Sequence, residues 1–182
     1  MFISKGKKRD TGLILLGFAT LMFGMETMSG AVEGLAEVEA FTNLFVLFTN
    51  PILGVLAGAL LTAVVQSSSA SVGILQALSV TGVISYEVAI PMVLGMCIGA
   101  CAPVLLSAIG ANVNGKRAAF VYLYFNLMGS VALMLPFYLL NAFIGFDFMS
   151  LTATSMGIAV VNTVYKVAAT ALLAPFAGLL EK

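Results

Sequence analysis

The sequence predicts an all-α integral membrane protein with about four transmembrane helices, an interfacial helix and a re-entrant helical hairpin. Of its 182 residues, 61% are hydrophobic and 9% are charged, with a mean hydropathy of +1.11. A soluble domain is about 45–50% apolar and about 25% charged. The charged residues are clustered, which leaves neutral stretches long enough to span a membrane. Four consecutive polar residues, Gln66-Ser67-Ser68-Ser69, interrupt the longest neutral stretch and are called the QSSS tetrad below.

The first transmembrane helix is expected at residues 12–29, after a basic cluster within residues 1–10. Basic residues beside a span favour the cytoplasmic side, so we expect the N-terminus to be cytoplasmic. A signal peptide has the same order of charged and apolar residues, but no A-x-A cleavage site follows. Residues 31–48 carry two glutamates one turn apart and then apolar residues at helical spacing, which indicates an amphipathic interfacial helix.

The predicted hairpin occupies residues 51–82, inside a run of 47 residues without a charge, from 40 to 86. Asn50-Pro51 is a good helix start and Thr81-Gly82 is a good stop. The tetrad divides this segment into halves of about 15 residues, or ~23 Å each, which is shorter than the ~30 Å of hydrocarbon in a bilayer. A re-entrant hairpin with the tetrad at its tip fits these lengths best, and two cramped full spans are the alternative.

Three further spans are expected, at residues 88–110, 118–142 and 150–180. Short cytoplasmic loops carry the excess of Lys and Arg. With a re-entrant hairpin, Lys116-Arg117 and Lys182 lie in the cytoplasm, whereas Glu87 and Asp147 lie outside. A single crossing by residues 51–82 would place Lys116-Arg117 outside. Residues 1–182 are therefore expected to form one membrane domain, with its N-terminus in the cytoplasm.

Composition argues against several classes of protein. Histidine is absent from the sequence, which removes the commonest general base and metal-ligating imidazole. Eight basic residues balance eight acidic ones, so the basic surface of a nucleic-acid binder is missing. Cys97 and Cys101 form neither a C-x-x-C redox pair nor half of a zinc site. We expect no enzyme activity, no cofactor and no nucleic-acid partner; the lipid bilayer is the expected surrounding.

The first candidate site is the segment from Thr62 to the QSSS tetrad. Broken helix is tolerated in a membrane only where it is buried in protein or lines a cavity. The helix that ends there offers free carbonyls to a cation, and the helix that starts there offers free N–H groups to an anion. Secondary transporters build substrate and ion sites from such discontinuous helices. Candidate substrate and ion ligands are therefore Thr62, Gln66, Ser67, Ser68 and Ser69, with sodium at Gln66, Ser67 and Ser68; close packing of small residues is the alternative.

A second candidate segment contains Gly95, Cys97, Gly99 and Ala100, followed by Pro103. The glycines and the proline interrupt an otherwise apolar span. The segment is either an unwound midpoint that faces the tetrad or ordinary packing of small residues beside a proline kink. The sequence leaves both interpretations open.

Two polar residues, Asn126 and Lys166, lie within the last two predicted spans. A lysine in the membrane costs about 2.5–3.5 kcal/mol on insertion scales, so a functional role is the default hypothesis. Snorkelling to the interface is the alternative, although Lys166 lies about 16 residues before the last residue, which is deep for that escape.

The segment TAVVQSSSASVGILQAL, residues 62–78, strongly resembles the QSSS signature of the sodium/phosphate cotransporter family. GLILLGFATLMFGMETMSGAV resembles the opening helix of a family repeat, and NPILGVLAGALLTAVVQSSSAS resembles its hairpin. GANVNGKRAAFVYLYFN is similar to the family's R-A-A-x-x-H-x-x-F-N segment. The resemblance extends from about Gly12 to Leu180 and covers a single repeat, most similar to the family's second.

The resemblance implies a transporter of two inverted repeats that couples inward sodium movement to uptake of inorganic phosphate, with Gln66, Ser67, Ser68 and Ser69 binding phosphate and sodium. The sequence departs from the family pattern at a few positions. Cys97 replaces an asparagine, Ala100 a threonine and Tyr122 a histidine, and Lys166 stands where asparagine is usual.

These observations lead to the expectation of a half-size, sodium-coupled phosphate transporter in the inner membrane of a bacterium. A single repeat is expected to pair with a second repeat chain or with another copy of itself. The Lys166 ammonium is expected to supply the positive charge that a sodium ion would otherwise bring, which would weaken sodium dependence. The alternative is a non-transporting membrane subunit, a remnant repeat with a structural or regulatory role.

Overall fold

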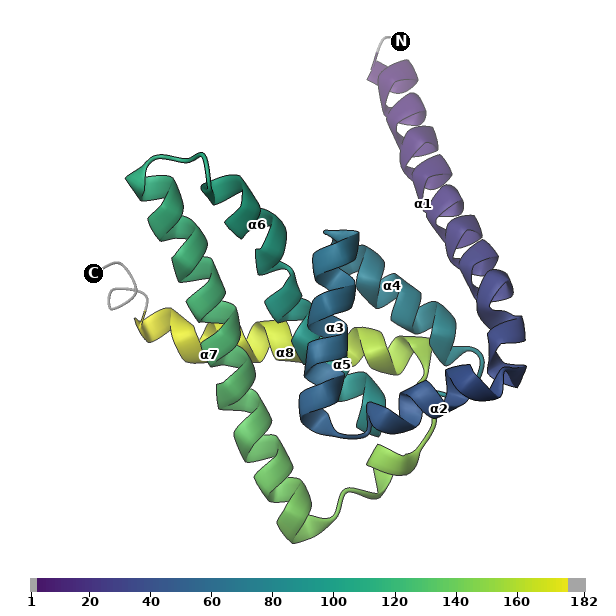
Figure 1. Ribbon diagram of the computed structural model, residues 1–182. Helices are drawn as coiled ribbons and strands as arrows, with labels where there is room; N and C mark the ends of the chain where they lie inside the picture. Colours follow the sequence, from purple (N-terminus) through teal and green to yellow (C-terminus); the bar gives the residue numbers. More distant parts are fainter. Residues whose placement is uncertain (1–2, 177–182) are drawn as a thin grey trace.

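The computed structural model describes residues 3–176, and this part of the chain is built from helices without a β-strand (Figure 1). In chain order these are α1 (Ile3–Glu33), η1 (Gly34–Glu37), α2 (Glu39–Leu47), α3 (Pro51–Val65), α4 (Ser68–Ser79), α5 (Tyr86–Gly99), α6 (Cys101–Ala108), α7 (Val113–Ile144), η2 (Asp147–Ser150), α8 (Ser155–Leu173) and η3 (Ala174–Phe176). Within residues 3–176, four stretches are long and apolar enough to cross a membrane: Lys8–Ala31, Tyr86–Ala108, Val113–Ile144 and Ser155–Leu173. The predicted class of all-α membrane protein is confirmed; the end of the last predicted span, residues 177–180, and Lys182 lie outside the described residues.

The segment predicted as one interfacial helix, residues 31–48, is divided into three pieces. Helix α1 continues to Glu33, the 3₁₀ turn η1 follows, and α2 begins only after Val38, whose backbone is extended. Gly34 starts the interruption, which fits its low helix propensity. In α2 the Phe45 side chain is buried in the core, where it packs beside the ring of Phe48.

The predicted ends of the hairpin are confirmed. Asn50 caps α3, because its Oδ1 accepts the Ile52 N–H at 3.0 Å, and Pro51 occupies the first helical turn. Both choices satisfy or remove N–H groups that a helix start leaves unpaired. Helix α4 ends at Ser79, and Gly82 follows with a φ of 78°, which a glycine adopts without strain.

Helices α3 and α5 approach so closely that a Cβ atom does not fit at the four glycines of their contact. On α3, Gly54 and Gly58 lie four residues apart, and on α5 so do Gly95 and Gly99. Added Cβ atoms would meet main-chain carbonyls of the facing helix: Met92 opposite Gly58, Val55 opposite Gly95 and Ala59 opposite Gly99. Small residues at this spacing are the usual means of close helix contact in membranes. Helix α5 therefore forms the centre of the fold, with residues 88–97 all buried.

The interruption between α5 and α6 is a kink rather than an unwound segment. Ala100 alone separates the two helices, and its backbone stays in the helical region at φ −60° and ψ −15°. Pro103 has no N–H to donate to the Gly99 carbonyl four residues earlier, and its ring crowds that carbonyl. Of the two interpretations left open by the sequence, the structure has the proline kink with packed glycines.

Hydrogen bonds tie the base of the hairpin to the start of α8. The Gln76 side-chain amide donates to the Ser155 carbonyl at 2.8 Å, and the Ser79 and Ser155 hydroxyl oxygens lie 3.3 Å apart. In the adjoining loops, the Ala153 N–H donates to the Ile84 carbonyl at 2.7 Å. Helix α4, the start of α5 and the start of α8 are thereby held as one unit.

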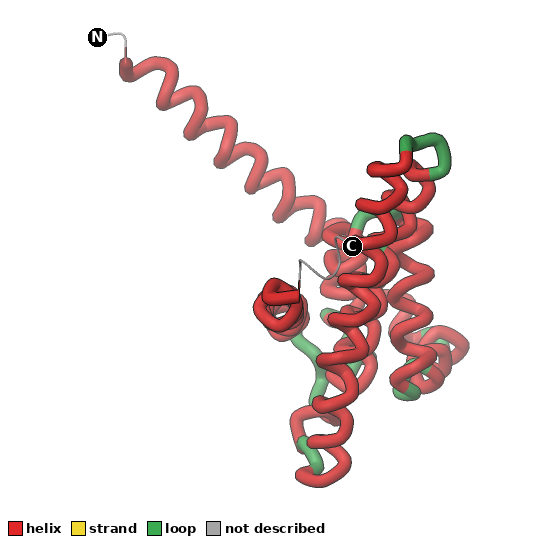
Figure 2. Tube along the Cα trace, turned by 90° about the vertical axis from the view of Figure 1, so that its left-hand side faces the viewer, coloured by secondary structure: helices red, strands yellow, loops and turns green. Residues whose placement is uncertain are grey.

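Helices α1 and α8 depart from the direction of the central helices. In Figure 1, α8 crosses behind α7, and Figure 2, turned by 90°, looks nearly along its axis. Helix α1 extends away from the other helices, and its membrane-length stretch has none of its residues buried (Figure 2). This long apolar surface faces lipid or another chain.

Candidate functional site

The QSSS tetrad lies at the tip where α3 and α4 meet, at the upper end of both helices in Figure 1. Gln66 ends α3 in the left-handed conformation, with a φ of 59°, and its N–H donates to the Thr62 carbonyl at 2.7 Å. Ser67 is extended and caps α4, because its Oγ accepts the Ala70 N–H at 3.3 Å. Two residues therefore turn the chain from the end of one helix to the start of the next.

This turn brings groups of opposite polarity together. The N–H groups of Ser68 and Ser69, in the first turn of α4, have no partner within their own helix. The carbonyls of residues 63–65, in the last turn of α3, likewise have no partner within theirs. The start of α4 carries the positive end of its dipole and the end of α3 carries the negative end. The tip can thus offer donors to an anion and oxygens to a cation.

The tip is open rather than packed. Gln66, Ser67 and Ser69 are exposed, and Ser68 is half-buried. Polar groups exposed in the hydrocarbon of a membrane are costly, so water, a ligand or another chain has to cover them.

Thr62 lies one turn before the tip and is fully buried, with 0% of its surface exposed. Its Oγ1 has no hydrogen-bond partner. Buried hydroxyls are normally paired, so an unpaired one at this place fits a ligand position. A Cβ added to Gly99 would lie 2.9 Å from the Thr62 Cβ, which shows how closely α5 passes the tip.

The remaining residues predicted on α5 and α6 take different positions. Gly95 and Gly99 lie in the contact with α3, and only Gly99 adjoins Thr62. Cys97 belongs to a core cluster shared with Tyr165 of α8, and Ala100 forms the kink. These residues position α3 and its tip, and within the described chain no hydrogen bond joins them to the tetrad.

Asn126 and Lys166 lie on α7 and α8, outside the hairpin. Asn126 is 8% exposed, and its amide donates to the Tyr122 carbonyl of its own helix at 2.9 Å. Lys166 is exposed on α8. The structure brings neither residue into hydrogen-bond contact with the tetrad.

Some polar residues that position the helices were not singled out from the sequence. Gln76 and Ser155 fasten the base of the hairpin, and the Ser130 hydroxyl lies 2.8 Å from the Tyr165 hydroxyl between α7 and α8. The sequence did carry a signal for them: a polar side chain within an apolar span is costly, as at Asn126, and is therefore expected to have a partner or a function.

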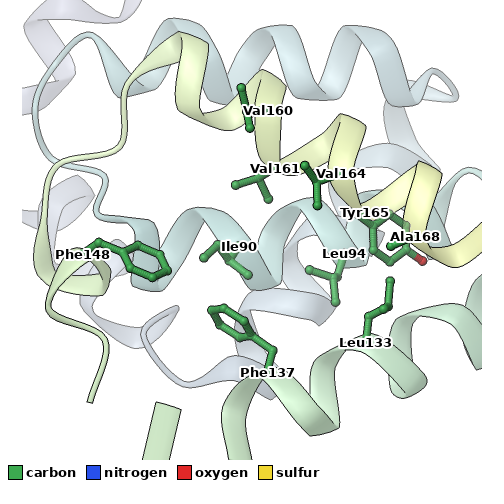
Figure 3. Close-up of a pocket in the computed structure, with 10 residues that line it drawn as sticks. All are labelled: Ile90, Leu94, Leu133, Phe137, Phe148, Val160, Val161, Val164, Tyr165 and Ala168. Atoms are coloured by element: carbon green, nitrogen blue, oxygen red, sulfur yellow. The ribbon is translucent and has the colours of Figure 1, made fainter. Parts of the chain in front are cut away.

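A cavity of about 300 Å³ lies between α5, α7 and α8, separate from the tetrad (Figure 3). Its lining is almost entirely apolar and includes Ile90 and Leu94 from α5, Phe137 from α7 and Val164 from α8. It offers no donor set for an oxyanion, so the polar tip remains the candidate transport site.

Comparisons with known proteins agree on one family. The family model described as Na+/Pi-cotransporter matches residues 20–161. An uncharacterized protein of Bacillus subtilis, YqeW, is 31% identical over 139 residues, which cover 76% of this chain and 44% of that protein. Human sodium-dependent phosphate transport protein 2B is 32% identical over 134 residues, covering 68% of this chain and 19% of that protein. YjbB of Escherichia coli K12, named as a candidate inorganic phosphate export protein, is 29% identical over 139 residues, or 75% of this chain and 25% of its own length.

The chain thus spans less than half the length of these relatives. No solved structure matches it. The family match covers most of the chain and includes α3, α4 and the tetrad between them. The chain therefore belongs to the Na+/Pi-cotransporter family.

Proposed function

We propose that this chain transports inorganic phosphate across the cell membrane, coupled to sodium, as a half-transporter that acts with a partner. One observation carries the proposal: the QSSS tetrad joins the carbonyl end of α3 to the N–H end of α4 at an exposed tip. Membrane transporters use such helix ends for anionic substrates and coupling ions.

Phosphate would bind at the α4 side of the tip. The unpaired N–H groups of Ser68 and Ser69 and the positive end of the helix dipole favour an anion there. The hydroxyls of Ser67, Ser68 and Ser69 and the Gln66 amide can donate further hydrogen bonds to phosphate oxygens. Hydrogen bonds to a charged acceptor are about twice as strong as those between neutral groups.

Sodium would bind at the α3 side of the tip. The carbonyls of residues 63–65 are unpaired within the helix, and the buried Thr62 Oγ1 lacks a partner. The Gln66 side-chain oxygen and the Ser67 and Ser68 hydroxyls add neutral oxygen ligands. A cation here would also offset the charge of phosphate bound one turn away.

A partner chain is proposed because the tip is exposed and the chain spans less than half the length of its relatives. The partner is a second repeat chain or another copy of this one. The proposed location is the inner membrane of a bacterium, with the N-terminus in the cytoplasm, because basic residues precede the first span.

The test is uptake of labelled phosphate into proteoliposomes that contain this chain, alone and with each candidate partner. We expect accumulation with an inward sodium gradient and none when potassium replaces sodium. Ser68→Ala should raise the phosphate concentration needed for half-maximal uptake. Ser107→Ala is the matched control, because the Ser107 hydroxyl bonds only to the Val104 carbonyl of its own helix, on α6.

The second candidate is a non-transporting membrane subunit. It is favoured by Cys97 and Ala100, which lack the side-chain oxygens of the asparagine and threonine that the family resemblance leads one to expect. Stable protein without uptake in any partner combination, or Ser68→Ala uptake with an unchanged phosphate dependence, would support this candidate and contradict transport at the tetrad.

Lys166 is proposed to reduce the need for sodium by placing a positive charge near the substrate in the assembled transporter. Its exposed position on α8 leaves it available to such an assembly. Lys166→Ala should raise the sodium concentration needed for half-maximal uptake. An unchanged sodium curve would contradict this role.

A further inference from the structure

The apolar cavity between α5, α7 and α8 takes half of its ten lining residues from α8 (Figure 3). Its ten lining residues come from these three helices and from η2: Ile90, Leu94, Leu133, Phe137, Phe148, Val160, Val161, Val164, Tyr165 and Ala168. From Val160 to Ala168 the cavity follows α8 for about 12 Å, at 1.5 Å per residue.

Hydrocarbon is the occupant that suits the lining. Tyr165 supplies the only polar side chain among the lining residues, and its hydroxyl is already paired with the Ser130 hydroxyl at 2.8 Å. A water molecule needs two to four polar partners, which this cavity does not offer. An empty cavity would forfeit the dispersion contacts of its lining, whereas acyl chains surround any membrane-spanning helix.

The dimensions fit one acyl chain better than a helix of another protein. A volume of about 300 Å³ over a length of about 12 Å gives a cross-section of about 25 Å². A helix with side chains is about 10 Å across, or roughly 80 Å² in section. A partner helix would therefore rest on the rim without filling the space.

The end of the cavity at Phe148 is aromatic, and two carboxylates neighbour it in the chain. The Phe148 ring stacks on Phe146 at 5.5 Å between centroids and lies 6.1 Å from the Tyr86 ring. Aromatic residues gather where a protein meets the membrane–water interface. The exposed carboxylates of Glu87 and Asp147 directly adjoin Tyr86 and Phe148 in the chain. The basic residue next to the lining is Lys166, which follows Tyr165 at the opposite end of the cavity.

We infer that this cavity binds one acyl chain of a phospholipid whose headgroup carries an amine, such as phosphatidylethanolamine. The headgroup lies at the Phe148 end, beside Glu87 and Asp147, and the chain runs along α8 toward Tyr165. An anionic headgroup would meet two carboxylates there and is disfavoured. This inference is independent of the proposed transport function.

The test uses the full chain in bilayers of equal parts phosphatidylethanolamine and phosphatidylglycerol, followed by mild detergent extraction and native mass spectrometry. We expect one phosphatidylethanolamine to remain per chain. Ala168→Phe fills the cavity and should remove this lipid. Val167→Phe is the matched control: it adds a similar bulk to the same helix at a position that is 64% exposed and does not line the cavity.

Headgroup selection is tested by substitutions of exposed residues, which should leave folding unchanged. Replacing both carboxylates, Glu87→Gln with Asp147→Asn, should keep the bound lipid but reduce the preference for the amine headgroup by about 1.5- to 5-fold, the range of an exposed ion pair. Retention of lipid by Ala168→Phe at the level of Val167→Phe would overturn the inference. So would bound phosphatidylglycerol in the unchanged protein, or a protein chain in place of the lipid.

Discussion

At the scale of single residues, Gln66 is both a candidate ligand and a residue with an unusual backbone conformation. Its φ of 59° lies in the left-handed region, which costs a residue with a Cβ roughly 1–2 kcal/mol. Among residues 3–176 it is the only non-glycine with positive φ. Such conformations persist where the surroundings enforce them, often at functional sites. Here the end of α3 and the start of α4 enforce it, and the turn aims both helix ends at the tip.

Substitution of Gln66 should therefore affect stability and transport differently. Gln66→Gly removes the strain and should raise the free energy of unfolding by about 0.5–1 kcal/mol after the greater chain entropy of glycine is subtracted. Gln66→Ala keeps the strain and loses the amide, so we expect no stabilisation. Both variants should lose sodium-driven phosphate uptake. Thermal unfolding in detergent, followed by circular dichroism, measures the first effect, and a less stable Gln66→Gly than Gln66→Ala would contradict it.

At the scale of elements, the contact between α3 and α5 decides where the tip lies. The glycines of both helices let the two backbones touch, and this contact sets Gly99 against Thr62 beside the tetrad. Gly73 of α4 is different, since an added Cβ there would meet nothing within 4 Å. The same substitution, glycine to alanine, is therefore expected to have opposite effects on stability in the α3–α5 contact and at Gly73.

Gly58→Ala should destabilise the protein, because the new Cβ would collide with the Met92 carbonyl and force α3 away from α5. Overpacking of this kind typically costs about 1–3 kcal/mol. Gly73→Ala is the control and should be neutral or stabilising by up to about 1 kcal/mol, since alanine favours the helix. Unfolding of the two variants in detergent compares them directly. Equal stability of the two would show that the α3–α5 contact is looser than the structure has it.

At the scale of the whole molecule, the arrangement in the membrane follows from helix length. Helix α3 has 15 residues and α4 has 12, so each is about 18–23 Å long at 1.5 Å per residue. Neither crosses about 30 Å of hydrocarbon by itself. The other four apolar stretches are 19–32 residues long. A re-entrant hairpin among four spans accounts for both lengths.

This arrangement predicts the side from which each loop can be labelled. Thr49→Cys and Thr81→Cys, at the two ends of the hairpin, should react with a membrane-impermeant maleimide from the same side of the membrane. Asn114→Cys, before α7, should react from the opposite side. The native Cys97 and Cys101 are buried and provide a low background. Reaction of the two hairpin ends from opposite sides would contradict the re-entrant arrangement.

Sequence reasoning located those features that depend on neighbouring residues. The cap at Asn50, the break at the tetrad and the stop at Gly82 are set by local backbone chemistry, and the structure confirms all three. The continuous helix expected at residues 31–48 was wrong, because Gly34 and the extended Val38 divide it.

The sequence by itself determined the membrane class, the helix ends and the composition of the polar tip, because hydropathy, capping and chain breaks act over a few residues. Only the tertiary structure decided what those residues face. It placed Gly95 and Gly99 in a helix contact, left Thr62 Oγ1 buried without a partner, exposed Lys166 on α8 and formed an apolar cavity between α5, α7 and α8. Each of these depends on which helix packs against which, and residues far apart in the chain meet only when the helices have packed.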